Sequence, residues 1–300
     1  MAKSKKVVKA PASHVKYYTL WPTMPDFPYD VVGISGHMRS GKDTIADILC
    51  QRYGYHKVLI AAPLHQMWSI CHNTSGSGCK DRSLRMIHSL LEDVCQKIGS
   101  PIPYDHLAEL THNVYGTYEA ATIMWPQITG TSVNVNAKRY FLQAMSEVLD
   151  TAYLGRPGIR AYTLWRIRHS LMQQQSIREN LLDMEQGDTP PLAAVVVPDI
   201  RFSEEATDIL NLQSGKVFFL KLAPALLRER LKGAGLEEEM KEHLTEKAID
   251  SVKDVPGVET IDIKKDLLDL PDEITSFLQQ IHRGETEAYE GLEMDKFGSW

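Results

Sequence analysis

Residues 31–49 read VVGISGHMRSGKDTIADIL, and this stretch decides the fold. It opens on a run of β-branched residues, which predicts a strand, and it closes on apolar residues at helical spacing, which predicts a helix. Gly36 and Gly41 bound the segment between them, and Lys42 follows. A strand, a glycine-bounded loop and a helix N-terminus form the arrangement in which backbone N–H groups surround a polyphosphate.

The composition narrows the class of protein. The chain has 300 residues, of which 43% are hydrophobic and 24% are charged, and these values are ordinary for a soluble globular protein. The net charge of −6 argues against non-specific nucleic-acid binding. No window approaches the ~18 apolar residues of a membrane span. We therefore expect a cytoplasmic protein that binds neither nucleic acid nor a membrane.

Strands and helices alternate along the chain, which predicts an α/β fold with a doubly wound, mostly parallel sheet of about five strands. Residues 57–62 are expected to form a strand that ends before Pro63, and residues 100–135 to be rich in loops. The uniformly apolar run at 193–197 is typical of a strand that is covered on both faces of a parallel sheet. Further strands are expected at 217–220 and 259–263.

The glycine-bounded loop meets the P-loop template Gly-x-x-x-x-Gly-Lys, with aspartate at position 43, where serine or threonine normally stands. The glycines let the backbone approach phosphate oxygens, and the lysine supplies a positive charge. The residues expected to bind the phosphates of ATP are Gly36, Arg39, Ser40, Gly41, Lys42, Asp43 and Thr44. An acid beside a triphosphate needs Mg2+ or its water between them, so we expect Asp43 to bind Mg2+ through water. The alternative is that Asp43 is a favourable acid in the first helical turn.

Asp199 follows the apolar run, at the carboxyl end of the expected strand, where ligands gather in open α/β sheets. An acid there suits the binding of Mg2+ through water, or the orientation of an acceptor group; the alternative is a cap for the next helix. Arg201 would place a cation at the same site, unless it forms a surface salt bridge. We expect Lys42, Asp199 and Arg201 to be the catalytic residues.

Five segments resemble the bacteriophage deoxynucleoside monophosphate kinases, P-loop enzymes that phosphorylate dNMPs with ATP. In the same order as in that family, the chain has SGKDT at 40–44, AAPL at 61–64, RYFLQ at 139–143, PDIR with Glu205 at 198–205, and HLTE at 243–246. The resemblance implies an NMP-kinase-like fold and transfer of the γ-phosphate of ATP to a dNMP, with Mg2+, to give dNDP and ADP. It also implies a homodimer, and the cytoplasm of the host if a phage encodes the chain.

The resemblance extends to the acceptor and the lid. The residues that it implies for acceptor binding are His65, Arg139, Gln143, Trp165, Asp199, Arg201 and Glu205. Arg228 and Arg230 are candidates for a lid that closes over the transferred group, and the alternative is that they are solvated helix charges. Ser146 and Glu147 replace a Gly-Thr pair of the family, which leaves the base specificity open.

The expected organisation has three parts. Residues 1–29 form a flexible N-terminal extension, residues 30–282 the kinase domain, and residues 283–300 an acidic tail. Within the domain, a helical acceptor-side region is expected at about 64–190 and a lid-like region at about 224–250. Two other functions remain open: a P-loop kinase of another small phosphorylated metabolite, and a nucleotide-binding protein without catalysis.

Overall fold

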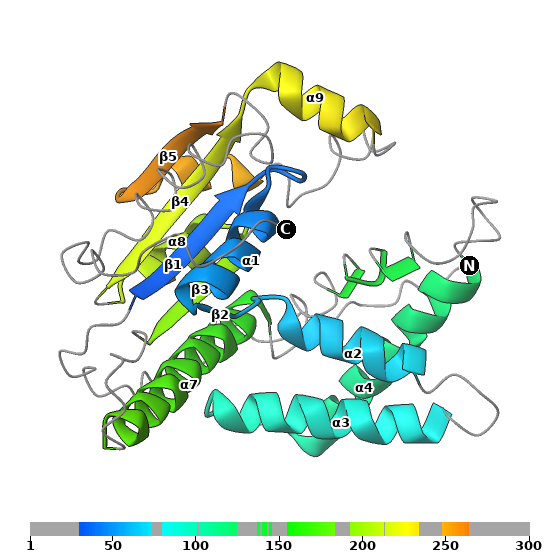
Figure 1. Ribbon diagram of the computed structural model, residues 1–300. Coiled ribbons are helices and arrows are strands. Elements are labelled where there is room, and N and C mark those ends of the chain that lie inside the picture. Colours follow the sequence, from blue (N-terminus) through cyan, green and yellow to red (C-terminus); the bar gives the residue numbers. More distant parts are fainter. Residues whose placement is uncertain are drawn as a thin grey trace. The chain divides into compact units, whose positions relative to one another are not determined.

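The computed structural model (Figure 1) describes residues 30–73, 80–100, 102–124, 137–138, 140–142, 144–145, 155–183, 193–212, 214–233 and 248–263. The chain divides into two compact units. The unit that contains the sheet comprises Thr23–Ser69 and Gly155–Trp300, and we call it the sheet unit; the other comprises Met1–Pro22 and Ile70–Leu154, and we call it the helical unit. The expected extension, acidic tail and most of the lid-like region lie outside the described residues, as do Arg139 and Gln143.

The sheet unit is built on five parallel strands in the order β2-β3-β1-β4-β5. Their bounds are β1 Asp30–Gly36, β2 His56–Lys57, β3 Ala194–Ile200, β4 Gly215–Leu222 and β5 Val258–Ile263. Strand β1 lies at the centre, between β3 and β4. This confirms the expected α/β class and the five-stranded parallel sheet.

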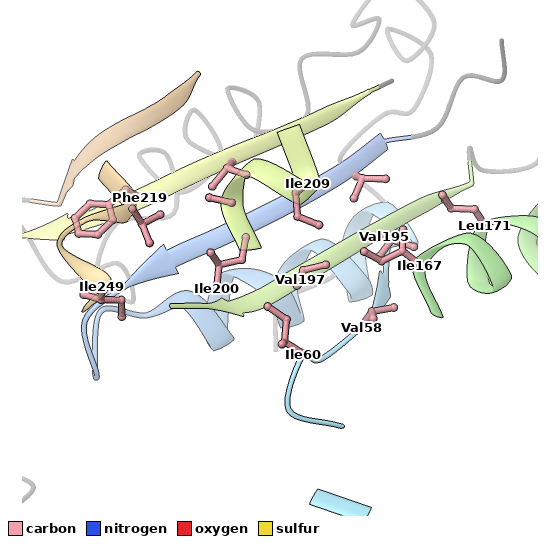
Figure 2. Packing of buried hydrophobic residues seen from close by; sticks show 14 of the residues in the cluster. Val58, Ile60, Ile167, Leu171, Val195, Val197, Ile200, Ile209, Phe219 and Ile249 are labelled. Atoms are coloured by element: carbon pink, nitrogen blue, oxygen red, sulfur yellow. The ribbon is translucent and has the colours of Figure 1, made fainter. Parts of the chain in front are cut away.

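Helices cover both faces of this sheet (Figure 1). Helix α1 (Lys42–Tyr53) packs on one face, where α9 (Pro224–Gly233) adds Leu226 and Leu227. The long helix α7 (Gly155–Asp183) and the short helix α8 (Ser203–Leu210) pack on the other face. Figure 2 shows the apolar side chains that fill this second layer, and a 3-10 turn at Val252–Asp254 completes it.

Strand β3 shows why the run at 193–197 is uniformly apolar. Val195 and Val197 face the layer of α7 and α8, whereas Ala194 and Val196 face the layer of α1. Pairing with β1 then slips by one residue, because Gly33 pairs with Val197 but Ser35 pairs with Ile200. The extra residue in β3 forms a bulge at positions 198 and 199, and this bulge lets the strand run on to Ile200.

The strand expected at 57–62 is largely wrong. Strand β2 has only two residues, and a helix, α2 (Ala62–Asn73), begins where the strand was expected to end. Pro63 lies in the first turn of this helix, where a missing N–H is tolerated. The proline therefore marks the start of a helix instead of the end of a strand.

The helical unit contains α3 (Lys80–Lys97), which packs against α4 (Tyr104–Glu119), and a π-helical turn follows at Ala120–Met124. The expectation of a loop-rich region is therefore wrong for 104–124. Leu107, Leu110, Val114 and Tyr118 form the buried stripe of α4, at helical spacing. None of the helices that the structure describes is both long enough and apolar enough to cross a membrane.

Candidate functional site

The glycine-bounded loop joins the carboxyl end of β1 to the first turn of α1, as the sequence predicts. Its backbone turns sharply, since Arg39 has a φ of 65° and Gly41, the N-cap of α1, has a φ of 93°. The N–H of Ser40 donates to the carbonyl oxygen of His37 over 3.0 Å and closes the turn. Because Gly41 has no side chain, it leaves the N–H groups of the first turn of α1 open to a ligand.

Gly36 is required at the start of the loop by close contacts. Its φ is 149°, and a Cβ atom there would lie 2.7 Å from the Ser40 hydroxyl oxygen and 2.9 Å from the backbone oxygen of Leu220. Any larger residue would therefore push the loop away from strand β4. The glycine keeps the loop backbone close to the sheet, beside the helix N-terminus.

Two buried polar groups lie in the loop. Ser40 is 1% exposed, and its hydroxyl has no hydrogen-bond partner among the described residues. Lys42 is 7% exposed, and its Nζ donates to the carbonyl oxygen of His37 over 3.5 Å. A buried hydroxyl without a partner is unfavourable, and such groups call for an explanation such as a missing ligand. An orphaned hydroxyl, a buried ammonium group and a helix N-terminus together fit the oxygens of a phosphate.

Asp43 and Thr44 lie in the first turn of α1, and both are exposed. A carboxylate there can reach a metal ion through water, and Mg2+ commonly combines one or two carboxylates with substrate phosphates. Without a metal, the Asp43 carboxylate would also interact favourably with the positive end of the helix dipole. No group of three or more potential metal ligands is found among the residues that the structure describes. The Mg2+ role of Asp43 stays a prediction.

Asp199 lies in the bulge of β3, beside the end of β1. The hydroxyl of Ser35, the residue before Gly36, donates to the carbonyl oxygen of Ile200 over 2.9 Å and holds the two strand ends together. Asp199 retains some exposed surface, but its carboxyl group is enclosed, and this burial raises its pKa. One carboxylate oxygen accepts from the N–H of Ile60 over 2.9 Å, and the other from the N–H of Ala61 over 3.0 Å.

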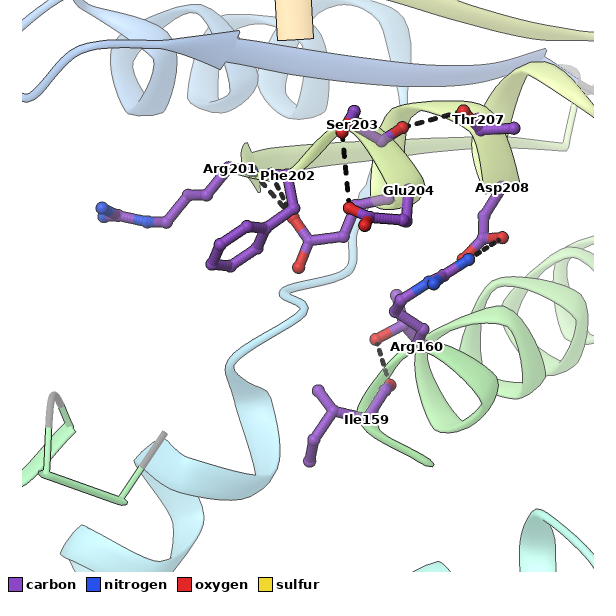
Figure 3. Close-up of polar contacts among 10 residues, drawn as sticks. Ile159, Arg160, Arg201, Phe202, Ser203, Glu204, Thr207 and Asp208 are labelled. Atoms are coloured by element: carbon purple, nitrogen blue, oxygen red, sulfur yellow. Dashed lines mark hydrogen bonds and ion pairs between the residues drawn. The ribbon is translucent and has the colours of Figure 1, made fainter. Parts of the chain in front are cut away.

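Glu205 caps the start of α8. Its Oε2 atom accepts from the N–H of Arg201 over 2.8 Å and from that of Phe202 over 3.1 Å. Burial raises the pKa of Glu205 to about 7; the bond from the Arg201 N–H opposes this shift, and the nearby Asp199 carboxylate adds to it. In Figure 3 the Arg201 side chain extends away from α8. The structure thus places Asp199, Arg201 and Glu205 at one edge of the sheet, and their acceptor-binding roles stay predictions.

The two lid candidates differ in their contacts. Arg230 donates from Nη1 to the carbonyl oxygen of Arg39 over 2.9 Å, so α9 touches the glycine-bounded loop. Arg228 donates over 3.2 Å to the carbonyl oxygen of Pro224 in its own helix. The contact of Arg230 joins residues 191 positions apart, and the spacing of charges along a helix gives no sign of it.

The loop has a second anchor that the sequence did not suggest. The Nε2 atom of His37 lies 3.4 Å from a carboxylate oxygen of Asp250, and its ring meets Phe219 edge-on at 6.3 Å between centroids. Phe219 and Asp250 belong to β4 and to the segment before the 3-10 turn. The carboxyl side of the sheet therefore supports the loop from several elements.

The remaining acceptor candidates lie in two helices of the sheet unit. His65 is half-buried in the first turns of α2. Trp165 lies in α7 between two stacked rings, with centroid distances of 5.7 Å to Tyr162 and 4.9 Å to His169. Contact of either residue with a nucleotide stays a prediction.

The described part of the site thus combines the loop at 36–44, the ends of β1 and β3, and one arginine of α9. Comparison with protein-family models and with curated protein sequences finds no match for this chain. The functional conclusion therefore depends on the residues themselves and on their geometry.

Proposed function

We propose that this chain is a P-loop phosphotransferase that transfers the γ-phosphate of ATP to a deoxynucleoside monophosphate. The observation that carries the proposal is the loop between β1 and α1. There, Ser40 and Lys42 are both buried at the N-terminus of a helix of 12 residues, and the Ser40 hydroxyl has no hydrogen-bond partner among the described residues. Gly36 keeps this loop close to strand β4, and Gly41, with a φ of 93°, begins the helix without a side chain that would cover its first turn.

The chemistry asks the protein for position and charge more than for covalent catalysis. An oxygen of the acceptor phosphate forms a bond to the γ-phosphorus, and the bond from that phosphorus to the β–γ bridging oxygen breaks, which releases ADP. Lys42 and the N–H groups of the loop would stabilise the negative charge on the donor phosphates. Arg201 would supply a second positive charge from the end of β3. Mg2+, when bound, neutralises phosphate charge, and Asp43 is the carboxylate next to the loop that would hold it.

The sheet order supports a second substrate at the same edge. From β1 the chain passes to β2 on one side, and from β3 it crosses to β4 on the other side of β1. In open α/β sheets, ligands bind outside the carboxyl ends of the strands at such a switch point. The phosphate loop follows β1, and Asp199 and Arg201 follow the apolar part of β3. The resemblance to phage kinases supports a dNMP as acceptor, with Arg139 and Gln143 as its predicted contacts.

The proposal is tested by ADP release from ATP and Mg2+ in the presence of each of the four dNMPs. Lys42→Ala should lower the dNMP-dependent rate by about 10²–10³-fold, as the loss of one preorganised charge-stabilising group does elsewhere. Lys57→Ala is the matched control, because Lys57 is a partly buried lysine of the same unit that pairs with Asp47 away from the loop. Circular dichroism should show both variants folded.

The other readings give different results in the same assay. If ADP is released only with non-nucleotide phosphate esters, the acceptor is another small phosphorylated metabolite and not a dNMP. Binding of ATP without release of ADP for any acceptor would make the chain a nucleotide-binding protein. Nearly full turnover of Lys42→Ala would show that the loop is not the donor site.

A further inference from the structure

Helix α2 has no capping residue of its own. It begins at Ala62, and the two residues before it, Ile60 and Ala61, are apolar, whereas helices are usually capped by Ser, Thr, Asp or Asn. Asp199 of β3 binds the turn just before this helix, because its two carboxylate oxygens accept from the N–H groups of Ile60 and Ala61. These residues lie 139 and 138 positions from Asp199 along the chain. The two residues that lead into α2 are therefore held by a strand far away in the sequence.

Two further contacts hold the same turn, residues 58–61. The N–H of Val58 donates to the carbonyl oxygen of Val196 in β3 over 2.9 Å. The Nη1 atom of Arg166 in α7 donates to the carbonyl oxygen of Leu59 over 3.1 Å. The turn is therefore fixed to β3 from one side and to α7 from another, and Asp199 holds its last two N–H groups.

The bulge in β3 gives Asp199 this position. Val197 and Ile200 both face the layer of α7 and α8, although an unbroken strand would place residues three apart on opposite faces. The extra residue allows this, and Pro198, which has no N–H to lose from the ladder, suits a bulge. Bulges often re-aim a side chain beside a functional site. Here the bulge brings the carboxylate to the start of α2.

Helix α2 is also the element through which the chain leaves the sheet unit. Its residues up to Ser69 belong to the sheet unit, and those from Ile70 to Asn73 belong to the helical unit. We propose that Asp199 is a positioning residue for acceptor binding. It holds the start of α2 at the edge of the sheet where the glycine-bounded loop lies. This inference rests on the proposed function. Each oxygen of Asp199 accepts an N–H group of the turn before α2, so we assign Asp199 to the support of α2 and not to direct binding of Mg2+.

The test compares wild type with Asp199→Asn and Asp199→Ala by amide hydrogen exchange and by steady-state kinetics. Exchange at Ile60 and Ala61 should become about tenfold faster or more, which is the effect of losing a hydrogen bond to a charged group. The KM for the dNMP should rise about tenfold, because a small misplacement of an oriented group is costly. The dissociation constant of ATP and the Mg2+ concentration for half-maximal rate should stay within about twofold of wild type.

Asp208→Asn is the matched control. Asp208 is a carboxylate of the same unit that is held by both Nε and Nη2 of Arg160 over 2.6 Å (Figure 3), and neither residue belongs to the turn at 58–61. It should leave exchange at Ile60 and Ala61 and the KM for the dNMP unchanged.

Three results would overturn the inference. A rise in the Mg2+ requirement with unchanged exchange would make Asp199 a metal ligand. Faster exchange with an unchanged KM would show that Asp199 holds the turn before α2 but has no part in acceptor binding. If wild type releases no ADP with any dNMP, the proposed function fails together with the acceptor part, while the exchange experiment still decides whether Asp199 holds the turn before α2.

Discussion

Glu205 should make the stability of this protein depend on pH in an unusual direction. Burial raises its pKa from the ordinary 4.5 to about 7. The folded state therefore binds this proton more tightly than the unfolded state, so the native state holds more protons between these two values. Stability from this group is complete below about pH 4.5, falls as the pH rises, and levels off above about pH 7.

The magnitude follows from the two pKa values. Each tenfold difference in proton affinity is worth about 1.4 kcal/mol, so ionisation of Glu205 should remove about 3 kcal/mol between pH 4 and pH 8. Glu205→Gln isolates this effect, since the amide oxygen can still accept from the N–H groups of Arg201 and Phe202 but cannot ionise. The variant should be more stable than wild type by a margin that grows by about 3 kcal/mol over this range.

The assay is urea unfolding of wild type and Glu205→Gln at pH 4, 6 and 8, followed by tryptophan fluorescence. Only the difference between the two proteins is compared, because other carboxyl groups titrate in both. Glu204→Gln is the control, since Glu204 is the exposed neighbour in the same helical turn. Parallel pH profiles for wild type and Glu205→Gln would refute the reasoning, because they would show that folding does not move the proton affinity of Glu205.

Two further variants test the packing and the loop. Gly215→Ala should lower the free energy of unfolding by about 3 kcal/mol, because its Cβ would lie 1.8 Å from a backbone carbonyl oxygen of α8. Gly116→Ala is the control, because Gly116 has open space around it on α4; it should instead raise the free energy of unfolding by about 0.5–1 kcal/mol. Both values are measured by urea titration, and an equal loss of stability in the two variants would refute the close contact at Gly215. Arg230→Ala should lower kcat/KM for ATP about fivefold by freeing the Arg39 carbonyl. Glu229→Ala changes an exposed residue of the same helix and should leave kcat/KM for ATP unchanged. Equal kcat/KM values for the two variants would show that the contact between Arg230 and Arg39 has no role in ATP use.

Local signals predicted the elements around the loop well. Helix α1 runs from Lys42 to Tyr53 and ends at Gly54, whose φ of 72° is the left-handed cap expected of a glycine there. The run at 193–197 forms the core of β3 because a strand covered on both faces needs apolar residues throughout. In both cases the deciding interactions lie within a few residues or depend on burial alone.

Other elements needed partners that the local sequence does not contain. Residues 58–61 look like a strand, but Asp199 and Arg166 hold them as a turn before α2. Helix α4 was missed because its polar residues weaken the apolar pattern; among them, Thr111 is buried and donates to the carbonyl oxygen of Leu107 over 2.8 Å. A buried hydroxyl that bonds within its own helix is tolerated in a helix core.

The sequence by itself determined the α/β class, the strand–loop–helix at 31–49 and the choice of Lys42, Asp199 and Arg201 as candidates. These follow from periodicity, glycine placement and the composition of short segments. Only the tertiary structure decided that the Ser40 hydroxyl is buried without a partner among the described residues and that Asp199 holds a turn 138 residues away. The reason is physical: burial and hydrogen bonding depend on which distant segments meet, and a pattern of neighbouring residues does not contain that information.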